Sequence, residues 1–238
     1  MTEALYRRDP YLAEAPGSVT AHTDEGGVIV EPALFYPTGG GQPGDSGHLD
    51  WSGGTLAVAT TVKAPGGGAI LVPGEPVPLP PVGTQVLQRL DRDRRLAHMR
   101  VHTALHLLSV VIPLPVTGGA IAAGTGRLDF AMPDPPEDRT ALETALNSLV
   151  DRDLPVTERW ITEAELDANP DLVKTMAVAP PRGAGQIRLV EIGSGADRID
   201  LQPCGGTHVA RTGEIGRVAI TKIANKGKQN RRVSIALA

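Results

Sequence analysis

Two histidines four residues apart carry the first indication of chemistry in this sequence. His102 and His106 lie in the segment HMRVHTALHLL, residues 98–108, whose composition favours a helix. Residues at positions i and i+4 share one face of a helix, so both imidazoles can point toward a single metal ion. About a hundred residues later, Cys204 and His208 have the same spacing. The chain therefore holds four candidate ligands of the types that zinc prefers.

The number of ligands bound at one time decides what such a metal ion can do. If all four bind, the site is closed and can be structural; if three bind, water or substrate can take the open position and be polarised. Thiolate and imidazole ligands favour zinc over magnesium or calcium. Gly205 and Gly206 lie between Cys204 and His208, where exposed amides can bind a carbonyl or its oxyanion. We therefore expect a substrate-facing metal centre.

A second glycine-rich segment occurs much earlier in the chain. Gly39, Gly40 and Gly41 are followed by Gln42, and successive glycines permit backbone conformations that side chains forbid. Composition favours a tight hairpin; the alternative is a loop that presses its amides against a ligand. The Gln42 amide can donate and accept hydrogen bonds, and Asp45 is a candidate to orient it.

Basic residues gather in two places. The segment KIANKGKQNRR, residues 222–232, has five basic residues and no acidic one, a composition that suits contact with a nucleic-acid backbone as well as a solvated surface. The candidates for binding RNA are Lys226, Lys228, Arg231 and Arg232. Five arginines also lie between residues 89 and 100, where local ion pairs on a solvated helix face are the first expectation and contact with phosphate is the alternative.

The elements that carry these residues follow from hydrophobic patterns. Residues 1–88 alternate short apolar runs with glycine and proline clusters, as in a small all-β domain. A long helix is expected from Arg89 to Ile112, although its start overlaps a possible strand at 86–90. Further helices are expected at 137–153 and from Thr162, strands within 186–202, and a final hairpin of 218–223 with 233–237. We expect domains at 1–88 and 89–238.

Composition limits the class of protein. The chain has 238 residues and a net charge of −4, which divides into −6 for residues 1–88 and +2 for the remainder. The absence of a long apolar run or a signal peptide predicts a soluble, cytoplasmic protein without a membrane partner. The single cysteine excludes an internal disulfide. Aromatic residues make up only 3%, which argues against base stacking as the main mode of recognition.

The combination of these segments carries a family resemblance. VHTALHLL and DLQPCGGTHVARTGEIG resemble the editing domain of alanyl-tRNA synthetases, which is related to that of threonyl-tRNA synthetases. With FYPTGGGQPGDSG before them and IANKGKQNRRVSIAL at the end, the chain is similar to the freestanding AlaX proteins, in the form with an N-terminal β-barrel. The resemblance implies an α+β protein: a β-barrel-like domain, then a two-layer α/β editing domain with an antiparallel sheet and a long zinc-bearing helix.

The resemblance also implies a function. It indicates a trans-editing hydrolase that deacylates mischarged tRNA(Ala), chiefly Ser-tRNA(Ala), with Gly-tRNA(Ala) as a second candidate, and that uses no nucleotide cofactor. The implied zinc ligands are His102, His106, Cys204 and His208. The implied substrate-binding residues are Gly39, Gly40, Gly41, Gln42 and Thr125. The segment AIAAGTGRLDF around Thr125 departs from the bulkier or polar aromatic stretch expected in the family, so the pocket shape there stays open.

Several roles and rival functions stay open in the sequence. Residues expected to take part in catalysis are Gln42, Gly205, Gly206 and His208. Gln42 cannot be the general base because an amide does not titrate; His208, if it does not bind metal, and the vicinal hydroxyl of the tRNA are the candidates. Two rival functions fit part of the pattern: a zinc-stabilised RNA-binding module without catalysis, and a zinc hydrolase of small esters or amides.

Overall fold

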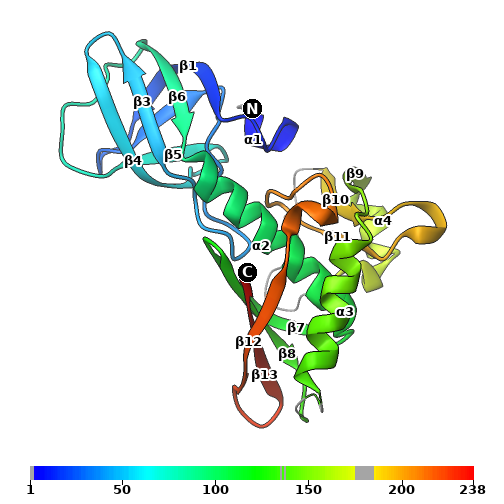
Figure 1. The fold of residues 1–238 in the computed structure, drawn as a ribbon. Helices are drawn as coiled ribbons and strands as arrows, with labels where there is room; N and C mark the ends of the chain where they lie inside the picture. The colour runs from blue at the N-terminus through cyan, green and yellow to red at the C-terminus, as the bar shows by residue number, and fades with distance from the viewer. Residues whose placement is uncertain (1–2, 135, 137, 175–184) are drawn as a thin grey trace. The chain divides into compact units, whose positions relative to one another are not determined.

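The computed structural model describes residues 3–134, 136, 138–174 and 185–238 (Figure 1). The chain divides into two compact units, residues 1–98 and 99–238, and the division falls within the longest helix, α2 (Arg92–Val111). The domain boundary predicted from the sequence lies earlier in the chain, near the end of the first unit's last strand. Each unit is described by itself.

The first unit is a closed, antiparallel β-barrel of six strands with a short helix, α1 (Leu5–Arg8), before it. The strands follow the order β1-β2-β5-β4-β3-β6 around the barrel, and β6 closes it by pairing with β1. Their bounds are β1 Glu14–His22, β2 Val28–Glu31, β3 Gly47–Trp51, β4 Gly54–Lys63, β5 Ala69–Pro73 and β6 Gln85–Leu90. The predicted N-terminal barrel is thereby confirmed.

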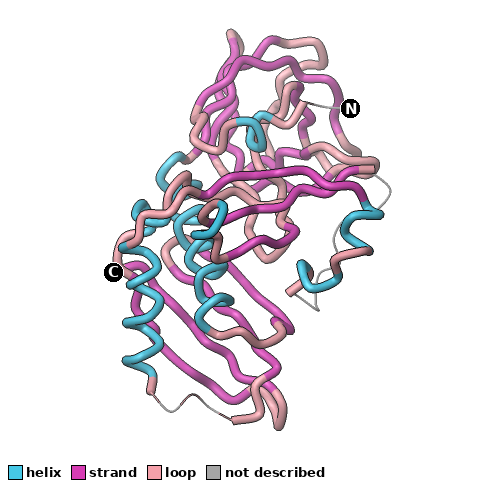
Figure 2. Tube along the Cα trace, turned by 90° about the vertical axis from the view of Figure 1, so that its right-hand side faces the viewer, coloured by secondary structure: helices cyan, strands magenta, loops and turns pink. Residues whose placement is uncertain are grey.

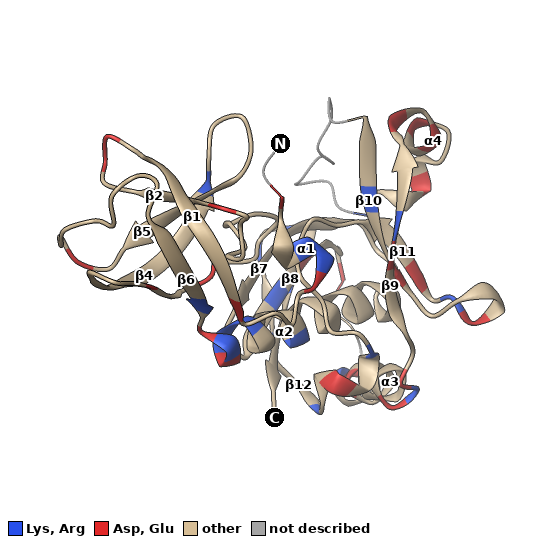
Figure 3. Cartoon of the chain, turned by 90° about the horizontal axis from the view of Figure 1, so that it is seen from above, with Lys and Arg blue, Asp and Glu red and all other residues tan. Residues whose placement is uncertain are grey.

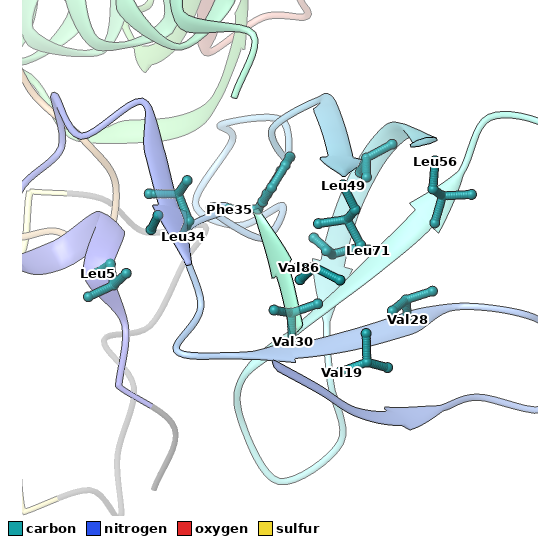
Figure 4. Close-up of a cluster of buried hydrophobic side chains, with 12 residues drawn as sticks. Leu5, Val19, Val28, Val30, Leu34, Phe35, Leu49, Leu56, Leu71 and Val86 are labelled. Carbon is teal, nitrogen blue, oxygen red and sulfur yellow. The ribbon is translucent and has the colours of Figure 1, made fainter. Parts of the chain in front are cut away.

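Alternation along the strands builds the barrel core. In β1, Val19 is buried while its neighbours Ser18 and Thr20 are partly or fully exposed, as the two-residue period of a strand requires. Leu49 and Leu56, which face each other across the β3–β4 hairpin, are both fully buried. Figure 4 shows such side chains from several strands converging on one apolar interior.

Residues 86–90 form a strand in the structure and not the start of the long helix. The segment pairs with β1 and β3, and α2 begins only at Arg92. Arg89 is therefore not a helical residue but a barrel residue that forms ion pairs with Glu14 and Asp50. The pairing of β6 with two strands outweighs the helical composition of the following residues.

The second unit combines helices with two antiparallel sheets, rather than the single sheet expected. One sheet has the order β12-β13-β8-β7 and the other β11-β10-β9. The strands are β7 Val116–Ala122, β8 Thr125–Ala131, β9 Val156–Thr162, β10 Gln186–Ile192, β11 Asp200–Pro203, β12 Val218–Asn225 and β13 Asn230–Leu237. The helices are α3 Arg139–Asp151 and α4 Glu163–Asp167, with 3-10 turns η1 Pro170–Leu172, η2 Gly195–Asp197 and η3 Thr212–Ile215. The mixed α+β class is confirmed.

Helices pack closely on the four-stranded sheet. A Cβ atom at Gly126 of β8 would lie 2.5 Å from Cγ1 of Val101 in α2, so glycine permits a contact that any larger residue would block. The α3 helix lies alongside the same sheet in Figure 2. There the side chain of Asn147 donates to the backbone oxygen of Val218 and accepts from its nitrogen.

Local signals in the sequence account for several element ends. A capping box begins α4, the helix expected from Thr162: the Thr162 hydroxyl accepts from the amide of Glu165, whose carboxylate accepts from the amide of Thr162. The C-terminal hairpin pairs β12 with β13 over the predicted residues. None of the helices in the described part of the chain is long and apolar enough to span a membrane.

Candidate metal centre

Helix α2 supplies the first half of the centre. Val101, Leu105 and Leu108 are buried, and this apolar packing fixes the helix so that His102 and His106 stand one turn apart. Their ring centroids are 5.3 Å from each other. Both side chains are largely buried, with 6% and 7% of their residue surfaces exposed.

Strand β11 supplies the second half. Cys204 follows the last residue of β11 and is held by a hydrogen bond from its amide to the backbone oxygen of Arg188. Its Sγ atom lies 3.4 Å from Nε2 of His102 and 3.3 Å from Nε2 of His208. The ligand atoms of His102, His106, Cys204 and His208 all lie within 4.8 Å of one another. The structure thus brings together the four residues that the sequence singled out.

The donor set and its spacing fit a tetrahedral zinc ion. Bonds of about 2.0 Å to nitrogen and 2.3 Å to sulfur place neighbouring tetrahedral ligands about 3.5 Å apart. The two sulfur–nitrogen distances above are close to that value. One sulfur and three imidazole nitrogens are also ligands that zinc accepts and that magnesium and calcium disfavour. A metal ion of this kind can be held by the residues present.

Two of the histidines are oriented by groups behind them. Nδ1 of His106 lies 2.9 Å from a carboxylate oxygen of Asp200, and Nδ1 of His208 lies 3.1 Å from the hydroxyl of Thr103. The Thr103 hydroxyl donates to the backbone oxygen of Met99 and so accepts from His208. In both rings Nδ1 then carries the proton and Nε2 is left to face the ligand cluster, an arrangement common around protein-bound metals.

Asp200 is itself held in a buried network. It is 3% exposed, and it accepts hydrogen bonds from Gln202 at 2.8 Å and from Lys174 at 2.5 Å. Burial raises the pKa of this carboxyl, but His106 and Lys174 outweigh burial and lower the pKa to about 2. A permanent negative charge therefore stands behind His106.

The cluster also favours the thiolate of Cys204. Burial raises the pKa of the thiol, but interactions with the neighbouring imidazoles of His102 and His208 outweigh burial and hold the pKa well below its usual value. For His106, burial lowers the pKa, whereas hydrogen bonds with Asp200 and Cys204 raise it to about 9. Burial, followed by His102, lowers the pKa of His208 to about 3. The thiolate is the form of cysteine that binds metal.

Arg188 fixes the turn between the two ligands of the second half. One of its guanidinium nitrogens donates to the backbone oxygens of Cys204 at 3.0 Å and Gly206 at 2.9 Å. In a trans peptide the N–H points opposite to the preceding C=O, so the amide of Gly205 points away from Arg188. Gly205 is exposed, its φ angle is not positive, and a Cβ there would meet no atom within 4 Å. Packing does not require this glycine. Because the residue is exposed, its amide can meet a ligand.

The glycine-rich segment of the first unit is a tight turn, as composition favoured. Gly39 and Gln42 exchange two backbone hydrogen bonds of 3.0 Å, and Gly40 and Gly41 have φ angles of 58° and 82°. Positive φ at both central residues is the reason for glycine there. The tyrosine hydroxyl of Tyr36 donates to the backbone oxygen of Gly39, and Gln42 is completely buried.

Asp45 closes this loop through an ion pair that the arginine pattern did not predict. Its carboxylate accepts from the amide of Tyr36 and from the guanidinium of Arg95, and both side chains of the ion pair are 2% exposed. Arg94 donates to the backbone oxygen of Gly44. The expectation of a solvated arginine face is therefore wrong for Arg95, which is a buried residue that anchors the loop.

The C-terminal hairpin separates its basic residues into two kinds. Lys226 and Lys228 are exposed. Arg232 forms a paired interaction with Asp129, with nitrogen–oxygen distances of 2.7 and 2.8 Å, and Arg231 donates to backbone oxygens that include those of Gly227 and Pro133. The lysines therefore carry the exposed charge of the tip. Thr125, the first residue of β8, is exposed, and its contact with a substrate stays a prediction.

Sequence reasoning missed the groups that support the ligands. These are Thr103, Lys174, Arg188, Asp200 and Gln202. The local pattern gave no signal even for Asp200: it and Gln202 alternate with Ile199 and Leu201, which predicts the solvent face of a strand, yet both are buried. The others depend on contacts distant in sequence.

Comparison with known proteins agrees with this geometry. Residues 187–234 match the family model described as the threonyl and alanyl tRNA synthetase second additional domain. The alanine–tRNA ligase of Pyrobaculum arsenaticum is 34% identical over 93% of this chain, which spans 25% of that enzyme. The alanyl-tRNA editing proteins AlaX-M of Methanosarcina barkeri and Methanosarcina acetivorans are each 34% identical, over 100% of this chain and 99% of their own length. Because the match to these editing proteins runs from end to end at this identity, the chain belongs to the AlaX family of alanyl-tRNA editing proteins.

Proposed function

We propose that the protein is a zinc-dependent deacylase that hydrolyses the ester of mischarged tRNA(Ala), chiefly Ser-tRNA(Ala) and in second place Gly-tRNA(Ala). The observation that carries the proposal is the buried cluster of His102, His106, Cys204 and His208 in a chain that matches alanyl-tRNA editing proteins over its whole length. Because the substrate is an aminoacyl-tRNA, the proposal includes a cytoplasmic location. Because hydrolysis of an ester consumes only water, the proposal includes no nucleotide cofactor.

The chemistry that a bound zinc ion supplies is polarisation of the ester carbonyl or of a water molecule. His102, His106, Cys204 and His208 would hold it, and a zinc ion with four protein ligands acts on a further oxygen by accepting a fifth ligand or by exchanging one of the four. The Gly205 amide, turned away from Arg188, is the backbone donor best placed to stabilise an oxyanion, while Gly206 is buried and its carbonyl is bound by Arg188.

The two nitrogens of His208 support a role as ligand rather than general base. Nδ1 interacts with Thr103 and Nε2 faces the sulfur of Cys204, so neither is directed to a substrate proton. We therefore assign the proton transfer to the vicinal hydroxyl of the tRNA. Gln42, Gly39–Gly41 and Thr125 stay predicted contacts of the amino acid.

The proposal is tested with Ser-, Gly- and Ala-tRNA(Ala) in one deacylation assay. We expect many serine molecules released per protein, slower release of glycine, and retention of Ala-tRNA(Ala). Binding of the RNA without turnover would favour the RNA-binding module. Equal hydrolysis of free seryl esters and of the tRNA ester, with no effect of neutralising Lys226 and Lys228, would favour the hydrolase of small esters.

A further inference from the structure

One exposed aromatic side chain has no evident role in folding the second unit. Trp160 of β9 is 46% exposed. Among the described residues the only other exposed aromatic residue is Tyr11, in the first unit. The neighbours of Trp160 along the strand, Thr157, Glu158 and Arg159, are exposed and polar. A single exposed apolar side chain is common on protein surfaces, so the case for a partner rests on the position of this indole relative to the metal centre.

Strand register places Trp160 in the same row as the metal centre. It is paired with Arg188 across β9 and β10, and the backbone oxygen of Arg188 accepts from the amide of Cys204. The row across the three strands is therefore Trp160, Arg188, Cys204. The two ends of this row, Trp160 and Cys204, are two strand spacings apart, a distance of about 10 Å.

The side chains in this row point to one face of the sheet. Directly paired residues of antiparallel strands have side chains on the same face, so the indole and the Arg188 side chain share a face. Glu158, two residues before Trp160 and hence on its face, forms an ion pair with Arg188, which agrees with this assignment. Arg188 reaches the carbonyls of Cys204 and Gly206. The indole therefore lies on the face that carries the turn beside the metal ligands.

The surroundings of the indole indicate the kind of partner. A protein partner usually covers a contiguous apolar patch, whereas polar residues flank Trp160 on its strand. The following helix α4 is acidic (Figure 3), which disfavours phosphate groups there and leaves a neutral base as the part of an RNA that can make this contact. A nucleobase needs only one π-face and tolerates a polar rim, and unpaired bases at RNA ends are bound by stacking on aromatic side chains. A single platform within about 10 Å of the reacting centre suits the last nucleotide of an RNA.

We propose that Trp160 is the stacking platform for the unpaired 3′-terminal base of the tRNA whose ester is hydrolysed at the metal centre. This inference rests on the proposed function for the identity of the RNA. Low aromatic content argues against stacking as the main mode of binding the whole tRNA, and it is compatible with one platform that positions the terminal nucleotide.

A kinetic test compares two esters that differ in the base. The substrates are the 3′-seryl ester of adenosine and the 3-seryl ester of methyl riboside, which keeps the vicinal hydroxyl and lacks the base. The variants are Trp160→Ala, Trp160→Phe and the control Leu114→Ala, which alters another exposed apolar residue of the same unit. We expect Trp160→Ala to raise KM for the adenosine ester about tenfold and to leave its kcat, and both constants for the riboside ester, unchanged. Trp160→Phe should keep most of the affinity. Equal effects on both esters, or none on either, would overturn the inference.

A binding test does not depend on catalysis. In a Trp51→Phe background Trp160 is the only tryptophan, and the trinucleotide CCA should quench its fluorescence to saturation. Absence of quenching contradicts the inference even if the protein is an active deacylase. Quenching in a protein that does not deacylate Ser-tRNA(Ala) contradicts only the proposed function. If Trp160→Ala converts a dimer into monomers in gel filtration, the indole belongs to an interface between copies and the inference is wrong.

Discussion

The side chains behind the ligands decide how the metal centre works at the scale of single residues. His106 is backed by a buried carboxylate and His208 by a neutral hydroxyl. A carboxylate increases the electron density that an imidazole offers to a metal, whereas a hydroxyl mainly fixes the ring. We therefore expect His106 to be the more strongly bound of the two.

The substitution Asp200→Asn tests this difference. It keeps the shape of the side chain and removes the charge that faces Nδ1 of His106 and Lys174, so zinc affinity should fall about tenfold or more. Competition with a chelator measures the affinity. Asp197→Asn is the control, because the carboxylate of Asp197 is 81% exposed. Equal zinc affinity in the Asp200 variant and the wild type would exclude an electrostatic role for Asp200.

The ligands could be predicted from the sequence and their supports could not. Each ligand pair has a four-residue spacing that is visible locally, as His102 with His106 and Cys204 with His208. Thr103 and His208 are joined only after α2 and the β11 turn have packed, and no local pattern records that contact. The same is true of Arg188 and the carbonyls it binds.

At the scale of elements, two glycines differ in whether packing requires them. Gly126 allows α2 to approach β8, because an added Cβ would lie 2.5 Å from Val101. Gly205 has no atom within 4 Å of such a Cβ. The first glycine therefore permits close helix packing, whereas packing does not explain the second, which we propose keeps the turn open to substrate.

Alanine substitutions separate these two roles. Gly126→Ala should lower the free energy of unfolding by about 1–3 kcal/mol, because α2 must shift. Gly205→Ala should change it by less than about 0.5 kcal/mol and lower the rate of deacylation, because its methyl group stands where the substrate approaches. Urea unfolding and single-turnover assays measure the two effects. The interpretation of Gly205 is wrong if its variant is fully active.

The start of α2 predicts a dependence of stability on pH. Burial, then Arg94, lowers the pKa of His98 to about 4, with Asp45 acting in the opposite direction. The unfolded chain binds a proton at this residue near pH 6.5, while the folded chain binds it only near pH 4, so the stability from His98 is present above pH 6.5 and is lost as the pH falls to 4.

Urea unfolding between pH 7 and pH 4.5 tests this dependence. The free energy of unfolding should fall less steeply with decreasing pH in His98→Gln than in the wild type, and the control His48→Gln, which alters an exposed histidine, should follow the wild type. Parallel slopes for all three proteins would contradict the assignment.

Elements were predictable where local signals were strong. Pro113 and Pro115 follow the end of α2, the capping box at Thr162 begins α4, and Gly227 lies in the turn between β12 and β13. The start of α2 was not predictable, because pairing of β6 with β1 and β3 decides it. The division of the second unit's strands into two sheets also depends on pairing between residues distant in sequence.

At the scale of the whole molecule, exposed charge decides the affinity for a polyanion. The net charge of −4 disfavours general attraction to RNA, so local positive charge has to supply it. In the C-terminal hairpin the arginines are bound to Asp129 and to backbone oxygens, which leaves the exposed Lys222 on β12 and the exposed Lys226 and Lys228 at the tip. Fold class and family were predictable from the sequence at this scale; which cations of the tip stay exposed was not.

Salt dependence measures the contribution of these lysines. The double variant Lys226→Gln/Lys228→Gln should raise KM for Ser-tRNA(Ala), and the plot of log kcat/KM against log salt concentration should become shallower by about one to two units. Arg217→Gln is the matched control, since Arg217 is exposed and precedes β12. A slope that does not change would place the RNA contact elsewhere.

The central claim is that the cluster of His102, His106, Cys204 and His208 is a catalytic zinc centre for editing. Its most direct test is to remove metal with a chelator and restore zinc in steps, while zinc content and the initial rate of serine release from Ser-tRNA(Ala) are measured on the same samples. The account predicts that activity is lost on removal and returns in proportion to zinc, up to one zinc per chain. Full activity in the metal-free protein would contradict it.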